Sequence, residues 1–221
     1  MAFHYSPKII NDRSLILYLD AANPRSYPGT GTIWTDISKS EYDSTLVSVT
    51  YNSVDSGSMV FNGSTSRVSC GDIPIGNSGT VNLWFKQDTA VANKGLVGIG
   101  PDTYLYIGGT TPNTLLALYN GVNYALGIYL NESATTWNFA TFVWSGTILT
   151  TYLNGGSAIS SNIPFTTSGS VVIGVYPTVG QISASSSYFN GKISNVQIYN
   201  RSLTDVEILQ NYNATKSRFG L

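Results

Sequence analysis

The sequence is poor in charge. Charged residues make up 10% of the 221 residues and the formal net charge is −1, whereas they make up about a quarter of an average globular domain. No run of Lys and Arg is present, and nucleic-acid binding depends on such clusters to neutralise phosphates. We therefore expect no nucleic-acid partner, and a polar surface built from Ser, Thr, Asn and Gly.

Cysteine, histidine and long apolar runs are equally scarce. Cys70 is the one cysteine, which excludes an internal disulfide and predicts a small buried strand residue. The one histidine, His4, has no Cys or His nearby, which argues against a zinc site or a Ser-His-acid triad. No apolar run reaches the roughly 18 residues that span a bilayer, and the N-terminus lacks a signal-peptide pattern. We expect synthesis in a cytoplasm and no membrane partner.

Short apolar stretches alternate with turn residues along most of the chain. Val81, Leu83 and Phe85 recur with period two, as on one face of a strand. Asn120-Gly121 is a strong hairpin signal because both residues tolerate positive φ. The expected strands are 15–19, 46–51, 58–61, 67–70, 81–86, 95–99, 103–107, 114–119, 123–130, 139–144, 147–153, 171–175 and 193–199.

This spacing predicts an all-β fold, a two-sheet antiparallel β-sandwich (jelly roll), rather than an α/β fold. Residues 1–13 are less patterned and are expected to form an N-terminal arm, which leaves 14–221 as one sandwich domain. One short C-terminal helix is expected, with Ser202 as its cap and Asp205 three residues later. Its apolar side is predicted from Val206, Leu209 and Tyr212.

Four segments resemble the laminin-G-like, concanavalin A-like superfamily. They are Phe61-Asn62-Gly63 with Arg67-Val68, Trp137–Phe142, Tyr152-Leu153-Asn154-Gly155, and the long run Phe189–Leu203. The resemblance implies a concanavalin A-like sandwich. Two departures, at Ser66-Arg67 and Ser145-Gly146, remove carboxylates that the family often has.

A narrower resemblance links the chain to laminin-G-like proteins of tailed bacteriophages, notably those of cyanobacteria. It is carried by Leu17–Gly29 with Trp34-Thr35-Asp36, and by Asn211–Ala214 with Arg218-Phe219-Gly220. The resemblance implies a virion structural protein whose partners are other virion proteins, above all the major capsid protein. A homo-oligomer is compatible with this role.

Some relatives of this superfamily are glycoside hydrolases that carry Glu-x-Asp-x-x-Glu on one strand. Glycoside hydrolysis needs two carboxyl groups at a set separation. The chain has only three glutamates, Glu41, Glu132 and Glu207, and Leu46 stands where the second Glu after Glu41-Tyr42-Asp43 would be. We therefore predict that the protein is not an enzyme.

Calcium is the one metal that the sequence leaves open. Asp20, Asp36 and Asp72 are the candidate ligands, because calcium takes six to eight oxygens, usually including several carboxylates. The alternative is that these aspartates cap turns through their own side chains. No cofactor is required under either interpretation.

Two sets of aromatic residues are candidates for binding a glycan or a partner. Tyr104 and Tyr106 alternate on one expected strand, and Tyr119 and Tyr129 lie on the next two, so paired strands would align a tyrosine stripe. Tyr27 and Trp34 in the long loop form the second set. The alternative is that both sets are packing residues, as is usual for large aromatics.

Two functions remain after these exclusions. The first is a capsid decoration protein on the exterior of a virion, a role that suits a surface poor in charge. The second is a glycan-binding adhesin or receptor-binding component of a tail or fibre, which would bind a cell-surface glycan. The fold alone is weak support for the second.

Overall fold

The computed structural model describes residues 7–54, 57–89, 94–99, 103–108, 114–119, 122–130, 136–156, 158–162, 178–179 and 187–221. Strands dominate, as the alternation of apolar residues predicts. In chain order they are β1 (Leu15–Asp20), β2 (Ile33–Trp34), β3 (Ser44–Val47), β4 (Thr50–Asn52), β5 (Ser58–Asn62), β6 (Arg67–Ser69), β7 (Ser78–Gln87), β8 (Lys94–Gly98), β9 (Thr103–Ile107), β10 (Thr114–Tyr119), β11 (Val122–Tyr129), β12 (Asn138–Ser145), β13 (Ile148–Leu153), β14 (Ala158–Asn162), β15 (Thr178–Val179) and β16 (Asn190–Tyr199). They are followed by helix α1 (Asp205–Thr215) and a 3₁₀ turn, η1 (Lys216–Phe219).

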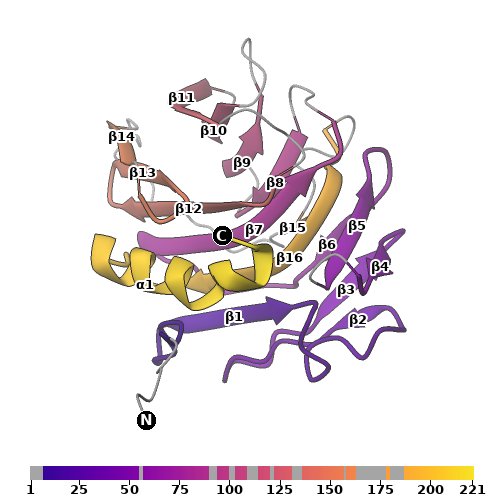
Figure 1. Ribbon diagram of the computed structural model, residues 1–221. Coiled ribbons are helices and arrows are strands. Elements are labelled where there is room, and N and C mark those ends of the chain that lie inside the picture. The colour runs from indigo at the N-terminus through magenta and orange to yellow at the C-terminus, as the bar shows by residue number, and fades with distance from the viewer. Residues whose placement is uncertain are drawn as a thin grey trace.

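The strands form two antiparallel sheets that face each other (Figure 1). The first has the order β14-β13-β12-β7-β16-β5-β4, and β1 pairs with the second half of β16, beyond the part that pairs with β5. The second has the order β11-β10-β9-β8-β15-β6-β3-β2. The predicted all-β sandwich with one short C-terminal helix is confirmed.

The main core fills the space between the sheets. Val81, Leu83 and Phe85 of β7 are all 0% exposed and belong to this core, as their period-two spacing predicts. Complete burial of such a side chain contributes about 1.5–3 kcal/mol. Cys70 lies in the same core, where burial raises the pKa of its thiol to about 12. The prediction of a small buried residue at this position is confirmed.

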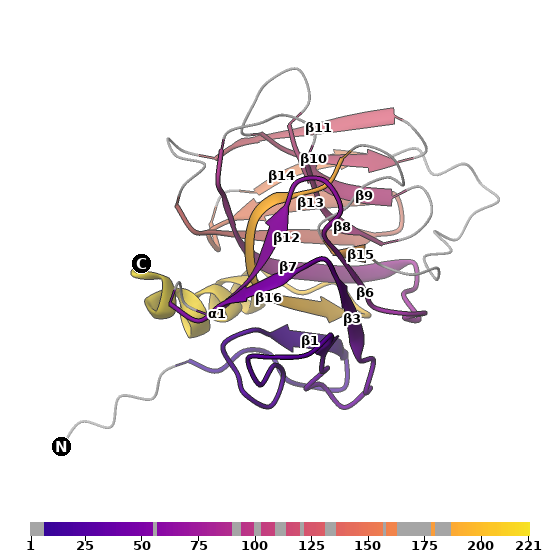
Figure 2. The same cartoon turned by 90° about the vertical axis from the view of Figure 1, so that its right-hand side faces the viewer.

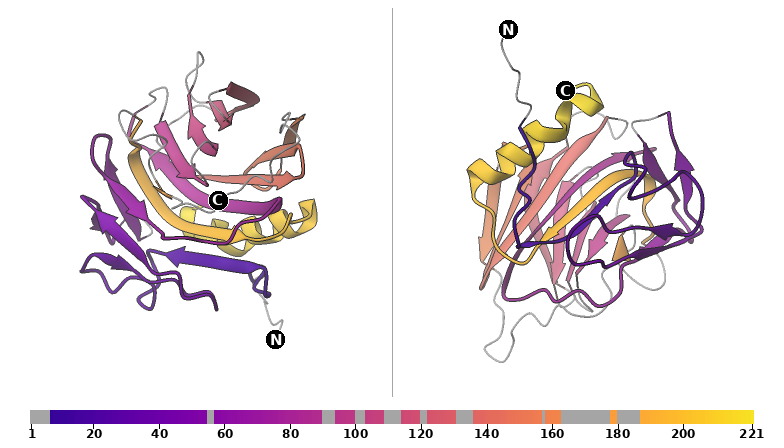
Figure 3. Two further views of the ribbon diagram at one scale, coloured as in Figure 1. Left: turned by 180° about the vertical axis from the view of Figure 1, so that it is seen from behind. Right: turned by 90° about the horizontal axis from the view of Figure 1, so that it is seen from below.

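Helix α1 covers the outer face of the first sheet (Figures 1 and 3). Thr204, not Ser202, is its N-cap, and it forms a capping box with Glu207. Ser202 instead donates its hydroxyl to the carbonyl of Trp144 at 2.8 Å. The predicted cap was wrong by two residues because either hydroxyl can start a helix.

The predicted apolar side of the helix was correct only at Tyr212, which stacks on Trp84. Val206 is 75% exposed and Leu209 is 44% exposed, whereas Ile208 and Asn211 are 0% exposed. The buried side thus includes a polar residue. A count of apolar residues at spacing three cannot find such a face, because the Asn211 side chain is buried with hydrogen bonds to Ile10 of the N-terminal segment and to Tyr199 of β16.

Two further differences concern strands. The single strand predicted over 46–51 is divided into β3 and β4, which belong to different sheets. Ser48 between them has a φ of 52°, a left-handed conformation that bends the chain. Strands β2, β14 and β15 were not predicted, and the predicted strand 171–175 lies outside the described residues.

The N-terminal segment, residues 7–13, lies against β16 and α1 rather than apart from the sandwich (Figures 2 and 3). The backbone N–H of Ile10 donates to Asn211 Oδ1 at 2.7 Å, and the carbonyl of Ile10 accepts from the Tyr199 hydroxyl at 2.8 Å. The rest of the predicted arm, residues 1–6, lies outside the described residues. The two ends of the described chain therefore lie side by side.

Candidate functional site

The strands of the predicted tyrosine stripe are neighbours, since β9 pairs with β10 and β10 pairs with β11. The register, however, sets Tyr104 opposite Leu118 and Tyr106 opposite Leu116, while Tyr119 is opposite Thr103. Tyr119 thus occupies a position out of phase with Tyr104 and Tyr106. Tyr129 is opposite Thr114.

The structure describes the side chain of one of these tyrosines. Tyr106 is 3% exposed, and burial raises the pKa of its hydroxyl. A ring so buried has no free face for a sugar, so the prediction of Tyr106 as a binding residue needs correction: it is a packing residue. The side chains of Tyr104, Tyr119 and Tyr129 lie outside the described part of the chain.

The second predicted patch, Tyr27 and Trp34, is also buried. Trp34 is 0% exposed and Tyr27 is 6% exposed. The Tyr27 hydroxyl donates to the carbonyl of Gly31 at 3.0 Å, and its ring contacts that of Tyr51 with centroids 5.1 Å apart. These aromatics hold the long loop in place, so they offer no surface for a ligand.

The three candidate calcium ligands do not converge. Asp36 accepts hydrogen bonds from the backbone N–H groups of Tyr18 (2.8 Å), Ser38 (2.8 Å) and Tyr42 (3.0 Å). Asp20 accepts from the N–H of Ala22 at 3.0 Å, and Asp72 is exposed. Within the described ranges, no group of three or more His, Cys, Asp or Glu side chains is arranged to hold a metal ion. Asp20 and Asp36 act as turn caps.

A pocket of about 450 Å³ lies where the two ends of the chain meet, which is within the usual size range of ligand sites. Its walls come from the N-terminal segment, from β1, and from the end of α1 with η1. The lining residues are Pro7, Lys8, Ile9, Asn11, Tyr18, Asp20, Ala214, Thr215, Ser217 and Arg218.

Asp20 and Arg218 form the polar centre of this pocket. Arg218 Nη1 lies 2.9 Å from Asp20 Oδ1, and Arg218 also donates to the hydroxyl of Ser194. The Tyr18 hydroxyl donates to Asp20 Oδ2 at 3.2 Å. Burial, helped by the neighbouring Asp20 carboxylate, raises the pKa of Tyr18, so this hydroxyl stays protonated. The pocket thus places an acceptor beside a donor-only guanidinium.

A buried amide lies beside Asp20 in the first sheet, outside the lining of the pocket. Asn195 of β16 is opposite Asp20 in the strand register and is 0% exposed. Neither polar atom of its side chain has a hydrogen-bond partner in the described structure. A buried polar group without a partner costs about 1–3 kcal/mol.

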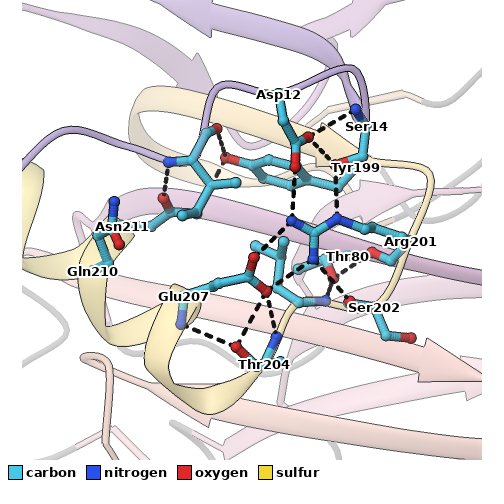
Figure 4. A network of polar contacts seen from close by, with 12 residues as sticks. Asp12, Ser14, Thr80, Tyr199, Arg201, Ser202, Thr204, Glu207, Gln210 and Asn211 are labelled. Carbon is cyan, nitrogen blue, oxygen red and sulfur yellow. Dashed lines mark hydrogen bonds and ion pairs between the residues drawn. The ribbon is translucent and has the colours of Figure 1, made fainter.

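A second polar cluster joins the N-terminal segment to the sandwich (Figure 4). We call it the latch, and it consists of Asp12, Ser14, Arg201 and Glu207. Arg201 binds both oxygens of Glu207, at 2.7 and 2.8 Å, and Asp12 Oδ2 at 2.9 Å. These contacts hold the pKa of the Glu207 carboxyl at about 2. The Ser14 hydroxyl, with Arg201, lowers the pKa of Asp12 to about 2 as well.

Glycoside hydrolysis requires one carboxyl group that stays protonated to act as the acid, whereas Asp12 and Glu207 of the latch are both bound to Arg201 and have pKa values lowered to about 2. Asp20 is the one carboxylate that lines the described pocket. Glu207 is bound in the latch, Glu41 lies in a loop with a φ of 59°, and Glu132 lies outside the described residues. The pocket can bind polar groups, but its described residues do not match an acid–base pair.

No described helix has the length and apolar character needed to cross a membrane. A search of curated proteins finds no match. Solved structures do match. Domain 4 of AbnA, an extracellular arabinanase from Geobacillus stearothermophilus in complex with arabinotriose, is 16% identical with a TM-score of 0.69, over 90% of this chain and 98% of that one.

Two other similar structures cover less of their own chains. The binding domain of botulinum neurotoxin DC, in complex with SialylT, is 14% identical with a TM-score of 0.66, over 91% of this chain and 52% of that one. Trypanosoma rangeli sialidase in complex with sialic acid is 15% identical with a TM-score of 0.68, over 94% of this chain and 34% of that one. At these identities the likeness shows the fold alone.

A family profile gives the more specific result. Residues 62–209 match the concanavalin A-like lectin/glucanases superfamily. This range holds most of the segments that carry the resemblance, including Phe189–Leu203, and most of both sheets. The protein therefore belongs to the concanavalin A-like lectin/glucanase superfamily.

Proposed function

We propose that the protein is a non-catalytic carbohydrate-binding module whose saccharide site is the pocket around Tyr18, Asp20 and Arg218. The observation that carries this proposal is the pairing of Arg218 with Asp20 at 2.9 Å in a pocket of about 450 Å³. The Arg218 side chain is 24% exposed and carries only donors, so it suits sugar hydroxyls, whereas the Asp20 side chain is 9% exposed and orients the guanidinium.

The similar solved structures indicate saccharides as the class of ligand. An arabinanase domain that binds arabinotriose and a neurotoxin domain in complex with SialylT share this sandwich. Fold likeness alone does not transfer a function, so the proposal rests on the polar groups of the pocket.

Titration calorimetry with four soluble saccharides tests the proposal: arabinotriose, 3′-sialyllactose, cellotriose and maltotriose. We expect at least one to bind, and Asp20→Asn to weaken its binding by about tenfold, as expected for loss of a charged hydrogen bond. Asp205→Asn is the matched control, because Asp205 bonds to Tyr152 and does not line the pocket. Absence of binding by all four, or equal binding by Asp20→Asn, would overturn the proposal.

The non-catalytic part of the proposal has its own test. Hydrolysis would need a second carboxyl group roughly 5–10 Å from the first, and the pocket is lined by one carboxylate among its described residues. We expect no reducing sugar to be released from arabinan or from the four saccharides during prolonged incubation. Release that disappears in Asp20→Asn would contradict a purely binding role.

A second candidate function is a structural protein of a bacteriophage virion, most simply a decoration protein bound to the major capsid protein. The phage-like sequence segments favour it, as do exposed aliphatic residues on a molecule with few charges: Val206 is 75% exposed and Leu221 is 52% exposed. It predicts stoichiometric amounts of the protein in purified particles, measured by quantitative mass spectrometry. Absence from the particles would end this candidate.

A further inference from the structure

The N-terminal segment forms one wall of the pocket. Pro7, Lys8, Ile9 and Asn11 all line it, opposite Tyr18 and Asp20 of β1 and the residues at the end of α1. Ile10 and Asp12 are absent from the lining. Ile10 and Asp12 can therefore affect the pocket only through the position of the segment.

Ile10 and Asp12 hold the segment without lining the pocket, whereas Lys8 and Ile9 line the pocket and also contact the sandwich or α1. Ile10 packs against the cluster that contains Leu15, Tyr199 and Ile208, and its backbone bonds to Asn211 and Tyr199 at 2.7 and 2.8 Å. Asp12 binds Arg201 at 2.9 Å in the latch (Figure 4). A further bond joins Gln210 Nε2 to the carbonyl of Lys8 at 2.7 Å.

These contacts are modest in strength. The side chain of Asp12 is 50% exposed and that of Arg201 is 34% exposed, so water screens their attraction. Ile9 and Ile10 are partly buried rather than fully buried. A terminal segment held in this way opens more easily than a core strand.

We propose that the saccharide site exists only while the N-terminal segment is docked, with Ile10 and Asp12 as positioning residues that never touch the saccharide. This inference rests on the proposed function. Saccharide binding and docking of the N-terminal segment are linked equilibria. If docking strengthens saccharide binding by a given factor, then the bound saccharide strengthens docking by the same factor. Apparent affinity falls in proportion to the docked fraction.

The test uses the full chain, the same four saccharides and two variants. Ile10→Asp places a carboxylate in the apolar contact, and Asp12→Arg places a like charge beside Arg201. Val206→Asp is the matched control, since it adds a carboxylate at a position on α1 that is 75% exposed. We expect Ile10→Asp to weaken binding by about tenfold or more, Asp12→Arg by less, and Val206→Asp by less than about twofold.

Amide hydrogen exchange supplies the reciprocal measurement. In the wild-type protein, a saturating saccharide should slow exchange of the Ile10 N–H, which is bonded to Asn211, by several fold. Exchange in β7 should not change, which distinguishes linkage from general stabilisation. A merely structural role for Ile10 would lower the unfolding temperature without this saccharide-dependent protection.

Weakened binding by Ile10→Asp or Asp12→Arg, together with saccharide-dependent protection of Ile10, supports the inference. Wild-type affinity in both variants, or no change in Ile10 exchange while a saccharide is bound, overturns it and leaves the proposed function standing. Failure of the wild-type protein to bind any of the four overturns both.

Discussion

At the scale of single residues, Asp36 shows how a charge-poor protein uses its few carboxylates. The side chain is 5% exposed and accepts four hydrogen bonds, three from backbone N–H groups and one from the Ser38 hydroxyl at 2.7 Å. The long loop of residues 20–44 has little regular structure of its own. Its backbone donors are therefore satisfied by side chains such as Asp36.

Removal of this carboxylate should be costly. We expect Asp36→Ala to lower the free energy of unfolding by about 2–4 kcal/mol, because several buried donors lose their acceptor at once. Asp36→Asn should cost less, since one amide oxygen can still accept the bonds from Tyr18 and Ser38. Urea denaturation measures both. Unfolding midpoints equal to wild type, or a midpoint that rises when calcium is added, would contradict a capping role.

The Glu207 carboxylate gives a pH-dependent prediction. Its pKa is lowered from 4.5 to about 2 in the folded protein, so its contribution is present above pH 4.5 and is lost as pH falls towards 2. Its side chain is 23% exposed, and screening by water limits the contribution to about 1 kcal/mol. Glu207→Gln should therefore be less stable than wild type at pH 7 and equally stable near pH 2. A difference that persists at pH 2 would argue against the ion pair as its source.

At the scale of elements, helix α1 is held by a face of which the sequence pattern identified only Tyr212. Ile208 and Asn211 are buried against the first sheet, and Tyr212 stacks on Trp84 with ring centroids 5.7 Å apart. Phe219 of η1 stacks on the same indole at 4.1 Å. The C-terminal residues thus complete a second core on the outer face of the sheet.

Substitutions on α1 should reproduce this pattern. Ile208→Ala should lower the free energy of unfolding by about 2–4 kcal/mol, through lost burial and the cavity left behind. Val206→Ala should change it by less than about 0.5 kcal/mol, because that side chain is already exposed. Guanidinium denaturation of the two variants distinguishes them, and equal costs would mean that the helix packs in another orientation.

The pairing of β7 with β12 can be tested at Gly79. This glycine is opposite Trp144, and a Cβ atom there would overlap the indole ring. Gly79→Ala should therefore destabilise the protein by about 1–3 kcal/mol. Gly76→Ala is the control, because a Cβ at that position meets no atom within 4 Å. Similar unfolding midpoints for the two variants would contradict the register of this strand pair.

At the scale of the whole molecule, sequence patterns predicted the sandwich better than the site. Period-two residues such as Leu83 and Phe85 define a strand locally, so the sheets and the main core could be expected from neighbouring residues. The pocket could not be predicted from neighbouring residues, because Asp20 and Arg218 are separated by 198 residues in the sequence. Arg218 stood within a recognisable motif, but no local pattern indicates its partner.

The remaining error is the prediction that aromatic residues bind a ligand. Tyr106 and Trp34 look like sugar-binding residues in the sequence, yet large aromatics bury 150–250 Å² each and more often serve the core. Of the polar residues that the structure brings together, the sequence marks Asp20 only as a candidate calcium ligand, and it assigns no binding role to Tyr18 or Arg218. Burial and partnership, which depend on the complete fold, decide which group is available to a ligand.

The proposed saccharide site is tested most directly by a crystal structure of the protein with a saturating concentration of whichever of the four saccharides binds. We expect density for the saccharide between the N-terminal segment and η1, within hydrogen-bond distance of Arg218. Density elsewhere on the sandwich, for example along β9–β11, with this pocket free of saccharide, would contradict it.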